Sequence, residues 1–135
     1  MRLNHRYKPN HRQGAALVEL AVCLPVLMVL ILGSIEATSA IFVRQALTTA
    51  AYEGAREASR ISSTTASATA RGQAVLNARN IRNSTIRFTP ASIENVSRGQ
   101  QFTVEVAAPL SGNSPLSGRV IPNQITTVRT VMVKE

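Results

Sequence analysis

Residues 15–35 form an apolar run of 21 residues in which Glu19 is the only charged side chain. As an α-helix rising about 1.5 Å per residue, the run would be about 31 Å long, close to the roughly 30 Å hydrocarbon thickness of a bilayer. Pro25 would interrupt a helix of a soluble protein, but membrane helices tolerate proline. The sequence therefore predicts a transmembrane helix over residues 15–35.

The residues before this run are basic. Arg2, Arg6, Lys8 and Arg12 precede Gly14 without an acidic residue, and they supply half of the formal net charge of +8. The bias of basic residues toward the cytoplasmic side predicts a cytoplasmic amino end and places the residues after Ile35 on the other side of the membrane. Other arginines occur between residues 56 and 87, but they are diluted by small polar residues and match no nucleic-acid-binding motif. We therefore do not expect a nucleic-acid partner.

Glu19 needs an explanation, because an ionised side chain inside a membrane is costly unless it is paired. If the chain is cut after Gly14, Ala15 gains an α-amino group about one helical turn from Glu19. The amino group of one subunit and the carboxylate of a neighbour would then neutralise each other in a packed assembly of helices. A buried charge pair of this kind fixes the stagger between neighbouring helices more effectively than it stabilises their assembly.

Three other interpretations of the first forty residues stay open. A secretory signal peptide could be cut at Thr38-Ser39-Ala40, although Glu19 and Pro25 are unusual inside such a segment. A lipoprotein would use Cys23, but Val22 is large for the residue that precedes a modified cysteine. An unprocessed membrane anchor explains the length of the run and leaves Glu19 unexplained, unless that side chain only extends to the interface.

Helical periodicity continues beyond the apolar run and predicts an amphipathic stem over residues 36–61. We expect i,i+3 ion pairs from Glu53 to Arg56 and from Glu57 to Arg60. The Ser-Thr sequence at 62–65 favours a turn and a new N-cap, so a second helix is expected over residues 66–80. The apolar face of the stem is made of Ile35, Phe42, Val43, Ala46, Leu47, Ala50, Ala51, Gly54, Ala58 and Ile61, and the opposite face carries Glu36, Arg44, Thr48, Glu53 and Arg60.

The residue pattern in the last third of the chain is typical of β-strands. Alternating or β-branched residues predict strands at 85–89, 101–106 and 125–133, with a turn at Arg98-Gly99. Residues 108–122 contain three prolines and two Ser-Gly pairs and are expected to be a loop, either a solvated connector or a recognition surface. The predicted fold class is α+β, with a long transmembrane-plus-stem helix, a short second helix and a small antiparallel sheet in residues 62–135.

Nothing in the sequence indicates an enzyme. The chain has no Asp, both histidines precede Gly14, and beyond the stem only Glu94, Glu105 and Glu135 carry carboxylate side chains. The lone Cys23 excludes an intramolecular disulfide and a cysteine-cluster metal site. We expect no catalytic residues, no metal and no cofactor. The alternative to an assembly protein is a single-pass membrane-anchored periplasmic binding module.

The stretch Gly14-Ala15-Ala16-Leu17-Val18-Glu19 resembles the cleavage site of type IV prepilins, which have a glycine before the cut and a glutamate at the fifth mature position. Residues 14–58 as a whole are similar to the TadE-like proteins of the tight-adherence (Tad, or Flp) pilus system. Besides Gly14 and Glu19, the resemblance is carried by Leu24-Pro25, Gly33, Glu36, Gln45-Ala46-Leu47, Ala50-Ala51 and Glu53-Gly54-Ala55-Arg56. Leu20 departs from the aromatic residue that often follows the glutamate in that family.

This resemblance implies a minor pilin, or pseudopilin, of the bacterial inner membrane with a pilin-like fold. It implies a leader over residues 1–14, cleavage between Gly14 and Ala15 by a prepilin peptidase, and a role for Glu19 in assembly and register. The implied partners are the peptidase, a sister pseudopilin, the major pilin and the pilus platform proteins, in pilus assembly, adhesion and biofilm formation. The carboxyl-terminal domain would lie in the periplasm, and the resemblance is compatible with incorporation of the subunit into the pilus.

Overall fold

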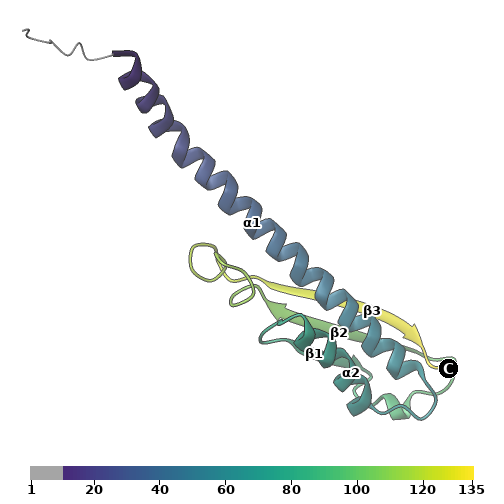
Figure 1. The fold of residues 1–135 in the computed structure, drawn as a ribbon. Coiled ribbons are helices and arrows are strands. Elements are labelled where there is room, and N and C mark those ends of the chain that lie inside the picture. Colours follow the sequence, from purple (N-terminus) through teal and green to yellow (C-terminus); the bar gives the residue numbers. More distant parts are fainter. Residues whose placement is uncertain (1–10) are drawn as a thin grey trace, which may run out of the picture. The chain divides into compact units, whose positions relative to one another are not determined.

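The computed structural model describes residues 11–135, with side chains from residue 14 onward, so most of the predicted leader lies outside the described residues. The chain divides into two compact units, residues 1–34 and 35–135, which are described separately below. Six elements follow one another along residues 11–135, and Figure 1 labels the two α-helices and three strands among them. They are the helices α1 (His11–Ser59) and α2 (Thr65–Ala78), strand β1 (Thr85–Thr89), the 3-10 helix η1 (Ile93–Asn95), and strands β2 (Gln101–Pro109) and β3 (Ile125–Val133).

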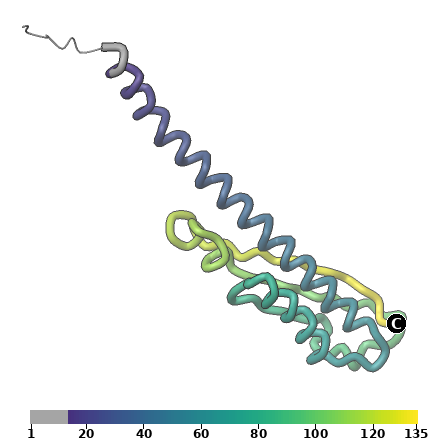
Figure 2. The backbone as a smooth tube through the Cα atoms, in the orientation of Figure 1, coloured from purple at the N-terminus to yellow at the C-terminus, as the bar shows by residue number. Residues whose placement is uncertain are grey.

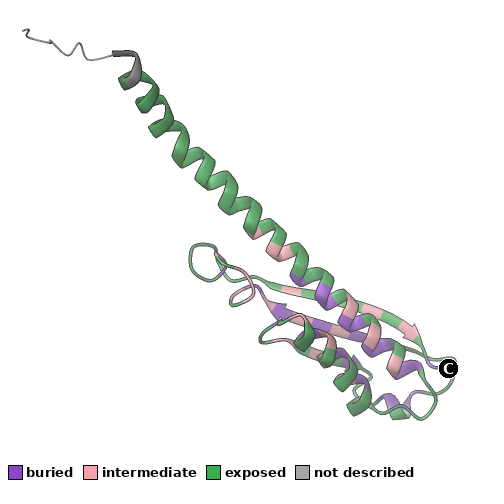
Figure 3. Ribbon diagram, in the orientation of Figure 1, coloured by how far each residue is buried: buried purple, intermediate pink, exposed green. Residues whose placement is uncertain are grey.

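Helix α1 continues through Pro25 without a break, as the interpretation of a membrane helix requires. In the first unit, every described side chain of this helix is exposed (Figure 3). The exposed fraction of its large apolar side chains runs from 42% at Leu32 to 71% at Val29. α1 is long and apolar enough to cross a membrane, and none of its most apolar window is buried against protein. Such a surface requires lipid or other helices around it.

The second unit contains an antiparallel sheet with the strand order β1-β2-β3. β2 is the central strand, with Ile86 opposite Val106 on one side and Val106 opposite Val128 on the other. Alternate side chains of β2 are buried, because one face of the sheet packs against the helices. Those residues are Phe102, Val104, Val106 and Ala108. Each of the three predicted strands is confirmed, and the middle one extends three residues further, to Pro109.

The two helices of this unit pack through small residues, which allow a close approach of the backbones. An ideal Cβ placed on Gly72 of α2 would lie 3.2 Å from the carbonyl oxygen of Ala50 in α1 and 2.9 Å from Cδ1 of Ile86. At Gly54 the corresponding contact, with the carbonyl oxygen of Ala68, is 3.4 Å. The helices therefore touch at a point where Gly72 has no room for a side chain.

Local signals explain the ends of the helices. Thr64 is the N-cap of α2, and its hydroxyl oxygen accepts a 3.1 Å hydrogen bond from the amide of Ser67. In return, the Thr64 amide donates a 3.1 Å hydrogen bond to the hydroxyl oxygen of Ser67, which completes a capping box. The predicted N-cap and second helix are thus confirmed, and the helix covers Thr65–Ala78 rather than 66–80. The turn predicted at Arg98-Gly99 is also confirmed, because these two residues form a turn in which Gly99 has a φ of 82°, shortly before β2.

The predicted amphipathic pattern of the stem is correct for its central residues, since Val43, Leu47 and Ala50 are fully buried. It is wrong at its two ends, where Ile35 and Ile61 are exposed by 46% and 67%. Phe42 is also exposed. Ile35 precedes the first buried position of the helix, Val43, and Ile61 follows the end of the helix at Ser59, so both lie outside the packed part of the stem.

Candidate functional site

The predicted cleavage position lies inside α1. The helix begins at His11, so the peptide bond between Gly14 and Ala15 falls within its first described turns. A Cβ added to Gly14 would meet no atom within 4 Å, and the same holds for Gly33 further along the helix. No contact within the described residues therefore accounts for a glycine at position 14.

Glu19 is exposed on the same helix, four residues after Ala15. In the part of the chain that the structure describes, no cation or hydrogen-bond donor pairs with its carboxylate. Its apolar neighbours Leu17, Val18 and Leu20 are more than half exposed. If this surface enters lipid, the carboxylate needs a partner from outside the described chain.

Glu36, the first residue after the apolar run, has a set of contacts that sequence reasoning missed. Its carboxylate accepts hydrogen bonds of 2.5 Å from the hydroxyls of both Ser114 and Ser117, and one of 3.1 Å from the amide of Leu116. These donors, led by the Ser114 hydroxyl, hold the pKa of Glu36 below its ordinary value. The sequence predicts Glu36 on the polar face of the stem, with no partner for its carboxylate. The serines at 114 and 117 supply the hydroxyl donors, and no spacing in the sequence links them to Glu36.

Further hydrogen bonds order the segment that Glu36 holds, which we call the β2–β3 loop (residues 110–124). The side-chain amide of Asn113 donates to the carbonyl oxygens of Arg82 at 3.0 Å and Pro109 at 2.8 Å, and its oxygen accepts from the Arg82 amide at 2.8 Å. Asn123 accepts from the amide of Ser111 at 3.0 Å. In Figure 2 the loop folds back on itself at the end of the sheet away from the carboxyl terminus. These hydrogen bonds give the loop a defined conformation, while residues 118–124 within it stay exposed.

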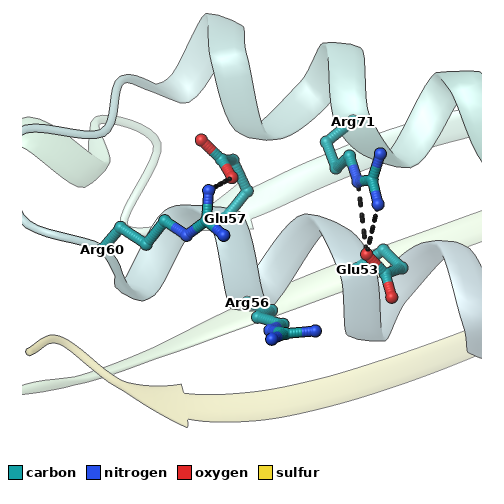
Figure 4. A pocket seen from close by; sticks show the side chains of 5 residues that line it. All are labelled: Glu53, Arg56, Glu57, Arg60 and Arg71. Carbon is teal, nitrogen blue, oxygen red and sulfur yellow. Dashed lines mark hydrogen bonds and ion pairs between the residues drawn. The ribbon is translucent and has the colours of Figure 1, made fainter.

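A cluster of charged side chains joins α1 to α2 around a hollow of about 300 Å³ (Figure 4). Arg60 pairs with Glu57 at 2.8 Å, as predicted. Glu53 does not pair with Arg56. Instead, its carboxylate accepts from Nε of Arg71 at 3.2 Å and from Nη2 at 3.0 Å, because α2 brings Arg71 alongside α1. Both arginines are more than half exposed, and surface ion pairs of this kind contribute about 0–1 kcal/mol each.

These features define an α+β protein with one amino-terminal helix that could span a membrane, followed by a small antiparallel sheet domain. Residues 14–56 match the family model described as TadE-like protein, which confirms the predicted resemblance over this segment. The matched residues include Gly14, Glu19 and Glu36, and they end before α2, the sheet and the β2–β3 loop begin. Neither the curated proteins nor the solved structures yielded a match to the chain.

Proposed function

We propose that this chain is a minor pilin, or pseudopilin, of the Tad (Flp) pilus machinery and acts in pilus assembly, adhesion and biofilm formation. The observation that carries the proposal is the TadE-like match over residues 14–56, which covers the apolar run and most of the stem. The exposed apolar surface of α1 supports it, because helices of this kind are covered either by lipid or by neighbouring helices.

In this proposal a prepilin peptidase removes residues 1–14, and the new amino terminus at Ala15 meets Glu19 of a neighbouring subunit. Support comes from the isolation of Glu19 among exposed apolar side chains and from its position one helical turn after Ala15. The chemistry of cleavage belongs to the peptidase, and this chain acts as a structural subunit rather than as an enzyme. Its partners are a sister pseudopilin, the major pilin and the platform proteins of the inner membrane.

The proposed orientation has a cytoplasmic leader and a periplasmic domain. The basic leader supports this orientation, since Arg2, Arg6, Lys8 and Arg12 precede the span without an acidic residue. A reporter fused after Glu135 that is active only in the periplasm tests the orientation directly. Activity of a reporter that works only in the cytoplasm, fused at the same position, would contradict the proposed orientation.

The decisive experiment measures the mass of the protein extracted from membranes of cells that express the whole Tad machinery. We expect a mature chain that begins at Ala15. The variant Gly14→Ala should accumulate uncut protein, whereas Gly33→Ala should be processed normally. Gly33 is a matched control because it lies in the same helix and an added Cβ there also meets open space. A full-length chain from wild-type cells, or one cut near Ala40, would overturn the proposal.

A further inference from the structure

A hollow of about 360 Å³ lies between the β2–β3 loop and the segment before β1. Two arginines line it, Arg82 and Arg119, together with small and polar residues of the loop and no acidic residue. Both arginines are exposed, and neither guanidinium forms an ion pair with any residue between 11 and 135. The hollow therefore presents two uncompensated positive charges, and arginine in such a setting favours phosphate because its planar fork matches the phosphate oxygens.

The hollow is tied to the residue at which the apolar run ends. Ser114 and Ser117 line it, and both donate hydrogen bonds to the carboxylate of Glu36, which directly follows Ile35. The carboxylate of Glu36 accepts three hydrogen bonds from the loop. The loop therefore contacts the first residue after the predicted span, residues 15–35.

Apolar side chains accompany the arginines. Val120 is 77% exposed and Ile121 37% exposed, and both follow Arg119 directly, with Pro122 also exposed. A single exposed valine needs no explanation, but a basic residue followed by exposed apolar residues beside a membrane exit is the combination that binds lipid surfaces. The backbone amides of Val120 and Ile121 turn back to the carbonyl oxygen of Leu116, which fixes this tip.

We propose that this end of the domain binds the phosphate headgroups of anionic phospholipids. Arg82 and Arg119 hold the phosphate in the hollow, and Val120 and Ile121 enter the headgroup region. The inference rests on the membrane anchoring in the proposed function. It adds a second, reversible contact that holds the domain against the membrane surface before the subunit leaves the membrane.

The test uses the full chain with Cys23→Ala, so that one introduced cysteine carries an environment-sensitive fluorophore. The labelled positions are Val120→Cys at the site, Leu30→Cys inside the span, and Ser97→Cys, which precedes β2 and so lies beyond the other end of the sheet from the loop. Each protein is reconstituted into vesicles of phosphatidylcholine alone or of an equimolar mixture with phosphatidylglycerol. Quenching by lipids that carry a quencher at the headgroup level reports contact.

We expect the probe at position 120 to be quenched in the anionic vesicles and much less in neutral ones, while the probe at 97 stays in water in both. Each arginine should contribute about a five-fold change in the docked population, so Arg82→Gln with Arg119→Gln should abolish the difference. The double variant Arg87→Gln with Arg98→Gln removes the same charge at exposed positions that do not line the hollow, and should preserve the difference.

A probe at position 120 that stays in water in both kinds of vesicle, while the probe at 30 lies in lipid, overturns this inference and leaves the anchoring intact. Equal quenching at 120 in neutral and anionic vesicles also overturns the role of the arginines. A probe at position 30 that stays in water contradicts the membrane anchoring itself.

Discussion

The ammonium nitrogen of Lys134 lies 2.8 Å from the carbonyl oxygen of Ala58, in the last turn of α1. The same nitrogen donates to the carbonyl oxygen of Arg60 at 3.0 Å and to the hydroxyl of Ser63 at 2.9 Å. The side chain is only 8% exposed, and the end of a helix leaves carbonyl groups in need of donors. Lys134 thus connects the end of β3 to the end of α1 by satisfying and partly neutralising the helix terminus.

Replacing Lys134 with Met should lower the free energy of unfolding by about 1–3 kcal/mol, because buried acceptors then lose their donor. Thermal unfolding of the full chain in detergent, followed by circular dichroism, measures this effect. Arg129→Met is the control, since its ion pair with Glu105 is largely exposed and should contribute little. Equal losses in the two variants would contradict the role given to Lys134.

Gly72→Ala should destabilise the domain by about 1–3 kcal/mol, as overpacking between helices does. The added methyl group would press on the backbone oxygen of Ala50, which cannot move without shifting α1. Gly54→Ala offers a matched comparison, since its new methyl group meets the Ala68 carbonyl oxygen only at 3.4 Å. That variant should be neutral or more stable by up to about 1 kcal/mol, because alanine favours the helix. Similar melting temperatures for the two variants would show that the helices are less close than the structure indicates.

Glu36→Ala should release the β2–β3 loop, because Ser114, Ser117 and the Leu116 amide lose their common acceptor. Arg119 lies in this loop and is exposed, so trypsin should cut after it faster than in the wild type. Mass spectrometry of the fragments reads the cut directly. Glu57→Ala, on the same helix, should leave the rate of this cut unchanged. An unaltered rate in Glu36→Ala would mean that the Asn113 contacts hold the loop alone.

Low pH should destabilise two places at which a glutamate carboxylate accepts hydrogen bonds: the β2–β3 loop, held by Glu36, and the start of α2, held by Glu94. Glu94 accepts from the amide of Thr65 at 2.7 Å and from its hydroxyl at 2.8 Å, and chiefly the amide bond lowers the pKa of Glu94. The pKa of Glu36 is lowered as well. A carboxyl group with a lowered folded-state pKa stabilises the fold above its ordinary value of 4.5 and loses that contribution as the pH falls through the folded-state pKa.

We therefore expect the free energy of unfolding to fall as the pH drops below 4.5, the ordinary pKa of a glutamate side chain. Chemical unfolding of the full chain at a series of pH values measures this dependence. The double variant Glu36→Gln with Glu94→Gln should show a shallower decline. An identical decline in wild type and variant would assign the acid sensitivity to other carboxylates.

Glu19→Gln should leave cleavage after Gly14 intact and reduce incorporation into pili, because glutamine keeps the shape of the side chain without its charge. Pilus yield from sheared cells and the mass of the membrane-bound subunit together separate the two steps. Glu53→Gln provides a charge-matched control outside the apolar run. Normal incorporation of Glu19→Gln would refute the pairing with Ala15.

The sequence predicts the elements of this fold well because their signals are local. The apolar run, the Thr64 N-cap and the alternation in β2 each depend on neighbouring residues alone. Contacts between distant segments were predicted less well. Glu53 pairs across to α2 and Glu36 reaches the β2–β3 loop, and no spacing rule within one helix indicates either partner. Most of the cleavage leader lies outside the described residues, so its prediction stays a prediction.

Strand β3 is an edge strand of nine residues, and no other strand within residues 11–135 pairs with its outer side. Ile125, Val131 and Val133 are all at least 45% exposed along it, so an isolated chain carries a ready template for sheet growth from molecule to molecule. Arg129 interrupts this apolar series and works as a gatekeeper against fibrous aggregation. Removing that charge in a purified sample should therefore shorten its shelf life even where the folded state is hardly changed.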